Sequence, residues 1–544
     1  MTNFRSMTEH SPTSIAFTAP HSAATEAGTK ILQQGGTAIE AMVAAAATIA
    51  VVYPHMNGLG GDGFWLISEP GKKPIAIDAS GVAANGATTE FYQGHDAIPS
   101  RGGKAALTMA GAVSGWDKAL QISHAWSSNN SKDNLPEDSL SLSALLSDAI
   151  SHARGGIEVT QSLEDASKKT HSDLSDLLGF ETFLNQGNVL KKGTILGLSK
   201  LGDTLEALSQ RGLQDFYHGE IAASLAADLE HAGSPIQLED FAQYSAQIVT
   251  PLEVRTQAGT LYNLPAPTQG IASLIILALY DQLRSQVETD VDSVHLLIEA
   301  TKQAFIARNQ YVTDSSRLDI DLSSLLSEES LDAMLKQISN EAAQPWPHVA
   351  KQGDTIWMGA CDDQGRMVSY IQSLYWEFGS GIVSPSTGIV WNNRGSSFTL
   401  EEGSLQQLAP KLKPFHTLNP AFAELSDGRR MSYGTMGGEG QPQTQAALFS
   451  RYVYHSKSLS QAISEGRWLL GRTWGDQSHN LKLESDIANE MGDALKARGH
   501  DLVTVPACNE LMGHAGAVVC HADGATSAAT DPRSDGRADA SRCE

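Results

Sequence analysis

The sequence predicts an α/β protein, and three stretches carry that prediction. Residues 22–34 have the apolar spacing of a helix that stops at Gly35-Gly36, a pair that commonly terminates helices. Residues 64–67, Phe-Trp-Leu-Ile, are a short apolar run typical of a buried strand. Two further apolar runs, 355–361 and 367–373, flank the turn-forming sequence Asp-Asp-Gln-Gly and predict a β-hairpin.

A second helix is predicted over residues 38–52. Thr37 and Glu40 have the spacing of a capping box at its start, and Pro54 follows its end. The helix is apolar on nearly all sides but too short to span a membrane, so it is expected to pack between layers. The glycine-rich residues 57–63 come before a strand and not between a strand and a helix, which excludes a phosphate-binding loop.

The rest of the chain carries fewer signals. Residues 127–143 are rich in Ser, Asn and Asp and predict an insertion or exposed loop. Residues 200–245 and 290–310 have helical periodicity with apolar stripes. His295 in the second of these is interpreted as a surface or core histidine, and no His, Asp or Glu cluster has metal-ligand spacing, so no metal and no cofactor are expected.

The composition excludes several classes of partner. A net charge of −24 over 544 residues argues against nucleic-acid binding. The four cysteines, Cys361, Cys508, Cys520 and Cys543, show neither disulfide nor metal spacing. The first 20 residues lack the apolar core of an export signal, so we expect a cytoplasmic protein without a membrane partner.

The hairpin places Thr355 at the head of a strand. If Cys361 faces Arg366 across the turn, Thr355 lies opposite Gln372 and within one residue of Ser373. A threonine hydroxyl needs a base to act as a nucleophile, and an α-amine with a pKa of about 7.7–8.0 suits that task. The hairpin alone favours an ordinary buried threonine, because Thr is common in strands and only cleavage between Asp354 and Thr355 would create the amine.

Several motifs, in this order and spacing, reduce that ambiguity: 45–64 (AAATIAVVYPHMNGLGGDGF), 264–274 (LPAPTQGIASL), the Thr355 hairpin, 378–393 (FGSGIVSPSTGIVWNN), 434–438 (GTMGG) and 531–533 (DPR). Together they make residues 15–533 resemble the γ-glutamyltranspeptidase family of N-terminal-nucleophile hydrolases. The resemblance implies a four-layer αββα sandwich and a precursor that cleaves itself into a large subunit, 1–354, and a small subunit, 355–544. The two subunits would interleave as a heterodimer, with a dimer of heterodimers left open, and the polar residues 314–353 would be a mobile tail.

The resemblance also assigns catalytic roles. Thr355 would be the nucleophile, and Ser373 stands where the family usually has a second threonine. Gly437 and Gly438 match the pair whose N–H groups stabilise the oxyanion, a role for which glycine permits close approach.

The chain departs from γ-glutamyl enzymes at the amino-acid head group. The arginine that clamps the α-carboxylate is replaced by Ser80, and the aspartate that holds the α-amino group by Ser397. Arg394 follows the paired asparagines and brings a new cation, suited to a carboxylate. Tyr375 and Trp376 would shorten the pocket. The expected substrate-binding residues are Arg394, Tyr375, Asn393, Ser397 and the pair His416-Thr417, which replaces two serines.

The stretches DTIWMG, YWEFGSG and VWNNRG resemble the oxamate amidohydrolase branch of this family. Oxamate carries its carboxylate directly on the amide and has no amino group. The resemblance therefore implies hydrolysis of a small amide, oxamate to oxalate and ammonia through a threonine acyl-enzyme, and a place in purine degradation. Two alternatives stay open: a γ-glutamyltransferase, glutathione hydrolase or related acylase, and a scaffold that does not cleave itself.

Overall fold

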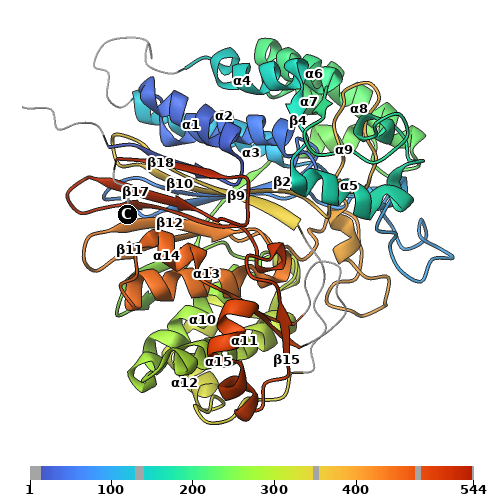
Figure 1. Ribbon diagram of the computed structural model, residues 1–544. Helices are drawn as coiled ribbons and strands as arrows, with labels where there is room; N and C mark the ends of the chain where they lie inside the picture. The colour runs from blue at the N-terminus through green and yellow to red at the C-terminus, as the bar shows by residue number, and fades with distance from the viewer. Residues whose placement is uncertain (1–13, 129–139, 347–353, 472–479, 542–544) are drawn as a thin grey trace, which may run out of the picture.

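A computed structural model describes residues 14–128, 140–346, 354–471 and 480–541. Two stacked antiparallel sheets form its centre (Figure 1). The first has seven strands in the order β18 (Arg537–Ala540), β1 (Ala16–Ala19), β9 (Asp354–Cys361), β10 (Met367–Tyr375), β2 (Asp62–Ser68), β3 (Ile75–Ala79) and β6 (Gln247–Val249). The second has six, in the order β17 (Thr526–Thr530), β16 (Ala515–Cys520), β12 (Arg430–Thr435), β11 (Ala421–Leu425), β8 (Gly259–Asn263) and β7 (Leu252–Thr256).

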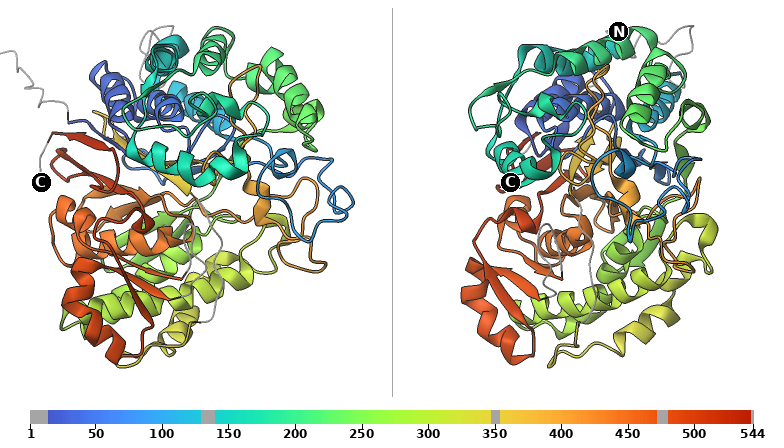
Figure 2. Two further views of the ribbon diagram at one scale, coloured as in Figure 1. Left: turned by 45° about the vertical axis from the view of Figure 1, so that its right-hand side comes forward. Right: turned by 90° about the vertical axis from the view of Figure 1, so that its right-hand side faces the viewer.

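Helices cover the outer face of each sheet, as both turned views also show (Figure 2). The seven-stranded sheet is covered by α1 (Ser22–Gln33), α2 (Ala38–Val52) and α3 (Ala112–Ser128). The six-stranded sheet is covered by α10 (Gly270–Leu283), α11 (Asp290–Tyr311), α13 (Gln441–Phe449) and α14 (Leu459–Ser464). The predicted four-layer αββα sandwich is therefore confirmed.

The remaining elements lie around these layers. Outside α2 are α4 (Leu142–Gly155), α5 (Gln161–Leu174), α6 (Ser199–Arg211), α7 (Asp215–His218), α8 (Glu220–His231), α9 (Leu238–Gln243) and the pair β4 (Ile157–Glu158) and β5 (Ile195–Leu196). Beside α11 are α12 (Glu328–Leu335), α15 (Ser485–Ala497) and a small sheet of β13 (Trp468–Leu470), β14 (Leu481–Glu484) and β15 (Leu502–Val505). No helix among the described residues is long and apolar enough to cross a membrane.

Strands from before and after residue 354 are interleaved in the seven-stranded sheet and meet at one pairing in the six-stranded sheet. In the seven-stranded sheet, β1 lies between β18 and β9, and β10 pairs with β2. In the six-stranded sheet, β11 pairs with β8. The two halves of the chain therefore share one core.

The Trp357 side chain of β9 packs between the two sheets. A Cβ atom added at Gly359, Gly434 or Gly516 would lie 2.7 Å or less from the Trp357 ring, so these three glycines make room for it. The indole N–H donates to Ser369 Oγ at 2.9 Å. This packing fixes the strand two residues after Thr355.

Several predictions about the elements hold, and others need correction. The capping box of Thr37 and Glu40 is confirmed. The hairpin register is shifted by one residue, because Cys361 pairs with Met367 and not with Arg366, which places Gln372 opposite Ile356 and not opposite Thr355.

The predicted mobile tail, 314–353, is wrong for its first part. Leu322, Leu325 and Leu331 are buried in the core beside α10, because their apolar side chains find a place there. Residues 347–353, and most of the predicted loop at 127–143, lie outside the described residues.

Candidate active site

Three neighbouring strands bring Thr355, Ser373 and Asp62 side by side. The central strand β10 pairs with β9 on one side and β2 on the other, and Ser373 pairs directly with Asp62. Thr355 Oγ1 donates to Ser373 Oγ at 3.3 Å. All three side chains are fully buried. Asp62 was not singled out from the sequence, although it is the one charge within the motif GLGGDGF.

The strand β10 ends in a strained turn directly after Ser373. The ladder with β9 shifts register between Gln372 and Tyr375. The Tyr375 N–H donates to Ser373 Oγ at 2.8 Å. Tyr375 and Phe378 adopt φ values of 85° and 56°, a left-handed conformation that bulky residues rarely take without support from their surroundings.

Arg394 lies fully buried against this turn. Its guanidinium carbon is 3.7 Å from the centre of the Tyr375 ring. Its Nη1 donates to Thr417 Oγ1 at 3.3 Å, while its Nε and Nη2 have no hydrogen-bond partner. Burial lowers the pKa of Arg394 to about 10, so it stays charged at neutral pH. A buried guanidinium with two unused donors fits a carboxylate ligand.

Asp62 and His416 form the opposite wall. Asp62 Oδ1 accepts from the Gly81 N–H at 2.7 Å, and Oδ2 lies 3.1 Å from His416 Nε2 and 3.8 Å from Arg394 Nε. Burial raises the pKa of Asp62 to about 7, although Arg394 opposes the shift. Burial holds the pKa of His416 well below its usual value, and His416 Nδ1 has no partner.

Gly437 and Gly438 adopt positive φ values of 120° and 54° at the end of β12. Within the described residues, neither N–H donates to a side chain or to a carbonyl outside its own helix, so both stay available to a ligand. Gln269, also not predicted, bridges this turn to the head-group wall, because its Nε2 donates to Gly438 O and Thr417 O at 2.8 Å each.

The other predicted residues have supporting contacts. Asn393 Oδ1 accepts from the Trp376 N–H at 3.1 Å, and its Nδ2 donates to Ser100 O at 2.9 Å, which holds the loop before Arg394. Ser397 is buried near the Tyr375 side chain. Asp354 begins β9 opposite Tyr375, and its side chain lies outside the described residues.

Ser80 stands where γ-glutamyl enzymes are expected to have an arginine, and the charges around it cancel. Its hydroxyl donates to Asp78 Oδ1 at 2.6 Å, and Lys413 Nζ pairs with Asp78 Oδ2 at 2.7 Å. This ion pair is internally balanced, so Arg394 is the cation of the site with unused donors.

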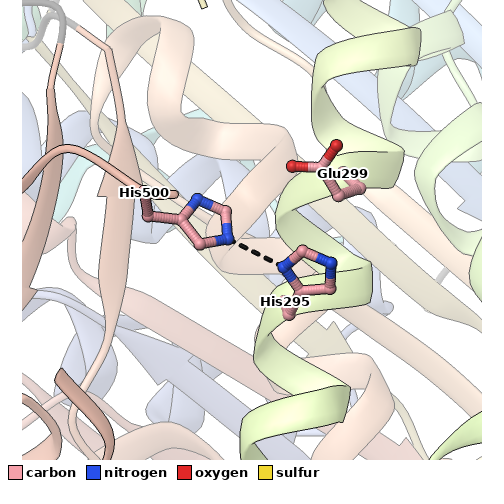
Figure 3. A group of neighbouring side chains, drawn as sticks. All are labelled: His295, Glu299 and His500. Carbon is pink, nitrogen blue, oxygen red and sulfur yellow. Dashed lines mark hydrogen bonds between the residues drawn. The ribbon is translucent and has the colours of Figure 1, made fainter. Parts of the chain in front are cut away.

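One group among the described residues has the proximity of metal ligands. His295, Glu299 and His500 are buried, with ligand atoms within 4.8 Å of one another (Figure 3). However, His295 Nδ1 is hydrogen-bonded to His500 Nε2 at 2.8 Å, and Lys302 Nζ lies 2.6 Å from Glu299 Oε1. The Lys302 ammonium already supplies positive charge here. Burial, with a smaller contribution from Lys302, lowers the pKa of both imidazoles, so the group fits a polar anchor in the core.

Comparisons with known proteins identify the family to which the chain is similar. The family described as gamma-glutamyltranspeptidase matches residues 24–541. The chain is 49% identical over 521 residues to the oxamate amidohydrolase proenzyme of Klebsiella pneumoniae subsp. pneumoniae, which covers 96% of this chain and 97% of that protein. It is 34% identical to the glutathione hydrolase-like YwrD proenzyme of Bacillus subtilis, over 95% of this chain and 97% of that one. The solved structure of cephalosporin acylase from Bacillus halodurans has a TM-score of 0.86 and 28% identity, with complete coverage of both chains.

Proposed function

Since this chain belongs to the gamma-glutamyltranspeptidase family and is a hydrolase of the N-terminal-nucleophile type, we propose that it cleaves itself before Thr355 and then hydrolyses oxamate to oxalate and ammonia. The subunits would be 1–354 and 355–544, held together as a heterodimer by the interleaved strands. The similarity to an oxamate amidohydrolase proenzyme supports the choice of substrate.

The observation that carries the proposal is the buried guanidinium of Arg394 with two unused donors. The guanidinium stacks on the Tyr375 ring, and the Tyr375 N–H donates to Ser373 Oγ. Ser373 Oγ also accepts from the Thr355 hydroxyl, so the three contacts connect Arg394 to Thr355. A carboxylate held there would stand close to the nucleophile, as in an amide whose carbonyl is bonded directly to the carboxylate. The planar fork of Arg394 suits such a bidentate contact.

The proposed reaction uses groups of the chain alone. The Thr355 amine, freed by cleavage, takes the proton of the Thr355 hydroxyl, which attacks the amide carbon. The N–H groups of Gly437 and Gly438 stabilise the oxyanion, and ammonia leaves with the transferred proton. Water then attacks the oxalyl ester and releases oxalate, which restores the hydroxyl.

Intact mass under denaturing conditions and an ammonia-release assay test the proposal together. The parent should give fragments of 354 and 190 residues (544 − 354) and turn over oxamate, whereas Thr355→Ala should stay one chain and be inactive. Thr204→Ala, which removes a buried threonine bonded to Thr387 O, serves as the matched control and should mature normally.

Each other result has a distinct meaning. A cleaved parent that hydrolyses a γ-glutamyl anilide but not oxamate would favour the glutathione hydrolase alternative. An uncut parent would favour a scaffold and contradict the mechanism.

A further inference from the structure

Resting on the proposed function, we infer that Asp62 is a built-in counter-ion of Arg394 that takes up one proton from solvent when the carboxylate of the substrate binds. The two side chains face each other, with Arg394 Nε 3.8 Å from Asp62 Oδ2. Both are buried, so the charges of Arg394 and Asp62 have only each other and a few hydrogen bonds to replace water.

The geometry makes a second anion costly beside an ionised Asp62. The contact of 3.8 Å is too long for a hydrogen bond and leaves Nε and Nη2 of Arg394 unused, so a carboxylate ligand would occupy them. Two carboxylates would then share one guanidinium in a site closed to water. Like charges so close in a buried site do not both stay ionised, and one proton relieves the repulsion.

The contact with His416 offers a place for that proton. With Asp62 ionised, His416 carries its hydrogen on Nε2 and donates to Oδ2 across 3.1 Å. With Asp62 protonated, its O–H donates to Nε2, and His416 carries its hydrogen on Nδ1 instead. The net change is one proton gained from solvent, and the unpartnered Nδ1 becomes a donor available to the ligand.

Within the part of the chain that the structure describes, no other neighbour of Asp62 accounts for the proton equally well. Lys413 and Asp78 neutralise each other at 2.7 Å. Burial raises the pKa of the nearby tyrosines, so they stay neutral throughout; they are Tyr217, Tyr244 and Tyr370. His416 stays neutral for the reason given above. The pKa of Asp62 is about 7, so a nearby anion that raises it further would lead Asp62 to take up a proton.

The consequence is selectivity by charge. A monoanion without an ammonium group binds with proton uptake and is favoured as the pH falls. A ligand that placed an ammonium group beside Asp62 would do the opposite and release a proton. The sign of the proton change therefore distinguishes the two ligand classes.

Calorimetry of the mature protein with pyruvate tests this inference. Pyruvate keeps the carboxylate and the adjacent carbonyl of oxamate but has a methyl group in place of the amide nitrogen, so it is not consumed. Titrations at pH 8 in two buffers of different ionisation enthalpy give the number of protons exchanged. We expect uptake approaching about 0.9 proton, because a group with a pKa near 7 is about 90% ionised at pH 8.

Asp62→Asn should abolish the uptake while keeping the acceptor for the Gly81 N–H. The Kd of the parent should rise about tenfold from pH 6 to pH 8, and that of the variant should stay level. Asp281→Asn is the matched control, since Asp281 is a buried carboxylate in a different layer that accepts from the Gln257 N–H. It should behave as the parent does.

Binding without proton uptake, or uptake that persists in Asp62→Asn, would overturn the inference; persistent uptake would assign the proton to another group such as the Thr355 amine. In both cases the proposed function would stand if oxamate is hydrolysed. Pyruvate that fails to bind would overturn the inference as well, and only a simultaneous lack of oxamate hydrolysis would contradict the proposed function. If Asp62→Asn does not mature, Asp62→Ser is the second variant, and proton uptake that persists in it on pyruvate binding would overturn the inference in the same way.

Discussion

The two walls of the pocket are built on different principles. The wall with Thr355, Ser373, Gly437 and Gly438 carries no side-chain charge and is held by strand pairing and by hydrogen bonds of 2.8 and 3.3 Å to the Ser373 hydroxyl. The wall with Arg394, Asp62 and His416 holds buried charges and three ring or guanidinium nitrogens without partners. Buried polar atoms are normally satisfied, so such exceptions mark where a ligand is expected. We therefore expect the proposed reaction to depend on the first wall and the choice of substrate on the second.

Removing the charge of the second wall should have the largest effect that spares maturation. Arg394→Met is expected to lower kcat/KM for oxamate by about 100-fold or more, because the loss of one partner of a buried charge pair costs about 2–5 kcal/mol. Self-cleavage, followed by intact mass, should change little. Equal losses of oxamate turnover and self-cleavage would mean that the two walls do not have separate roles.

A change in the first wall should affect both processes. Gly437→Ala forces a side chain onto a φ of 120° and displaces a predicted oxyanion donor. We expect turnover to fall by about 100-fold, the usual cost of losing one such donor, with slower self-cleavage. Gly403→Ala, at a φ of 78° with open space around it, is the control for backbone strain alone. A similar loss in both variants would contradict the assigned role.

Of the two walls, only the charged one should make the free energy of unfolding depend on pH. The pKa of Asp62 rises from 3.8 in the unfolded chain to about 7 in the folded one, so its stabilising contribution is complete below pH 4 and is lost as the pH rises to 7. Both proteins are compared in the uncleaved Thr355→Ala background. Between pH 5 and pH 8, the free energy of unfolding of the protein with Asp62 should fall by about 2.5 kcal/mol relative to that of the protein with Asp62→Asn. Urea unfolding at both values measures this difference, and parallel stability curves would refute it.

The smallest expected effect concerns Ser373. Ser373→Ala removes the two neutral hydrogen bonds that Ser373 Oγ accepts from the Thr355 hydroxyl and the Tyr375 N–H, which should lower turnover by about 3- to 10-fold. Ser373→Thr keeps the hydroxyl and should stay close to the parent in the same steady-state assay. A loss of more than 1000-fold in Ser373→Ala would instead make Ser373 an essential group of the first wall.

The parts of the molecule that could be predicted are those with local signals. The capping box at Thr37, the helix after it and the hairpin after Thr355 depend on residues close in sequence. The hairpin register was wrong by one residue because the turn sequence permits more than one closure. The family resemblance gave the αββα layers.

Asp62 and Gln269 were missed for a common reason. The pairing of Asp62 with Ser373 joins strands that lie far apart in the chain, and no local pattern specifies which strands become neighbours. Gln269 acts through two backbone carbonyls, which leave no mark in the sequence. An acid within a glycine-rich motif directly before a buried strand was the only available signal for the first.

The interleaving of strands from the two halves of the chain has a consequence for the lifetime of the enzyme. Before cleavage, unfolding and refolding concern one molecule. If the chain is cleaved at Thr355 as we propose, the same unfolding would release two polypeptides that must meet again, so recovery would depend on concentration and on aggregation of the separated pieces. Maturation would therefore make the fold persist through slow unfolding and not through reversible equilibrium, and a mature enzyme that loses its structure would rarely regain it.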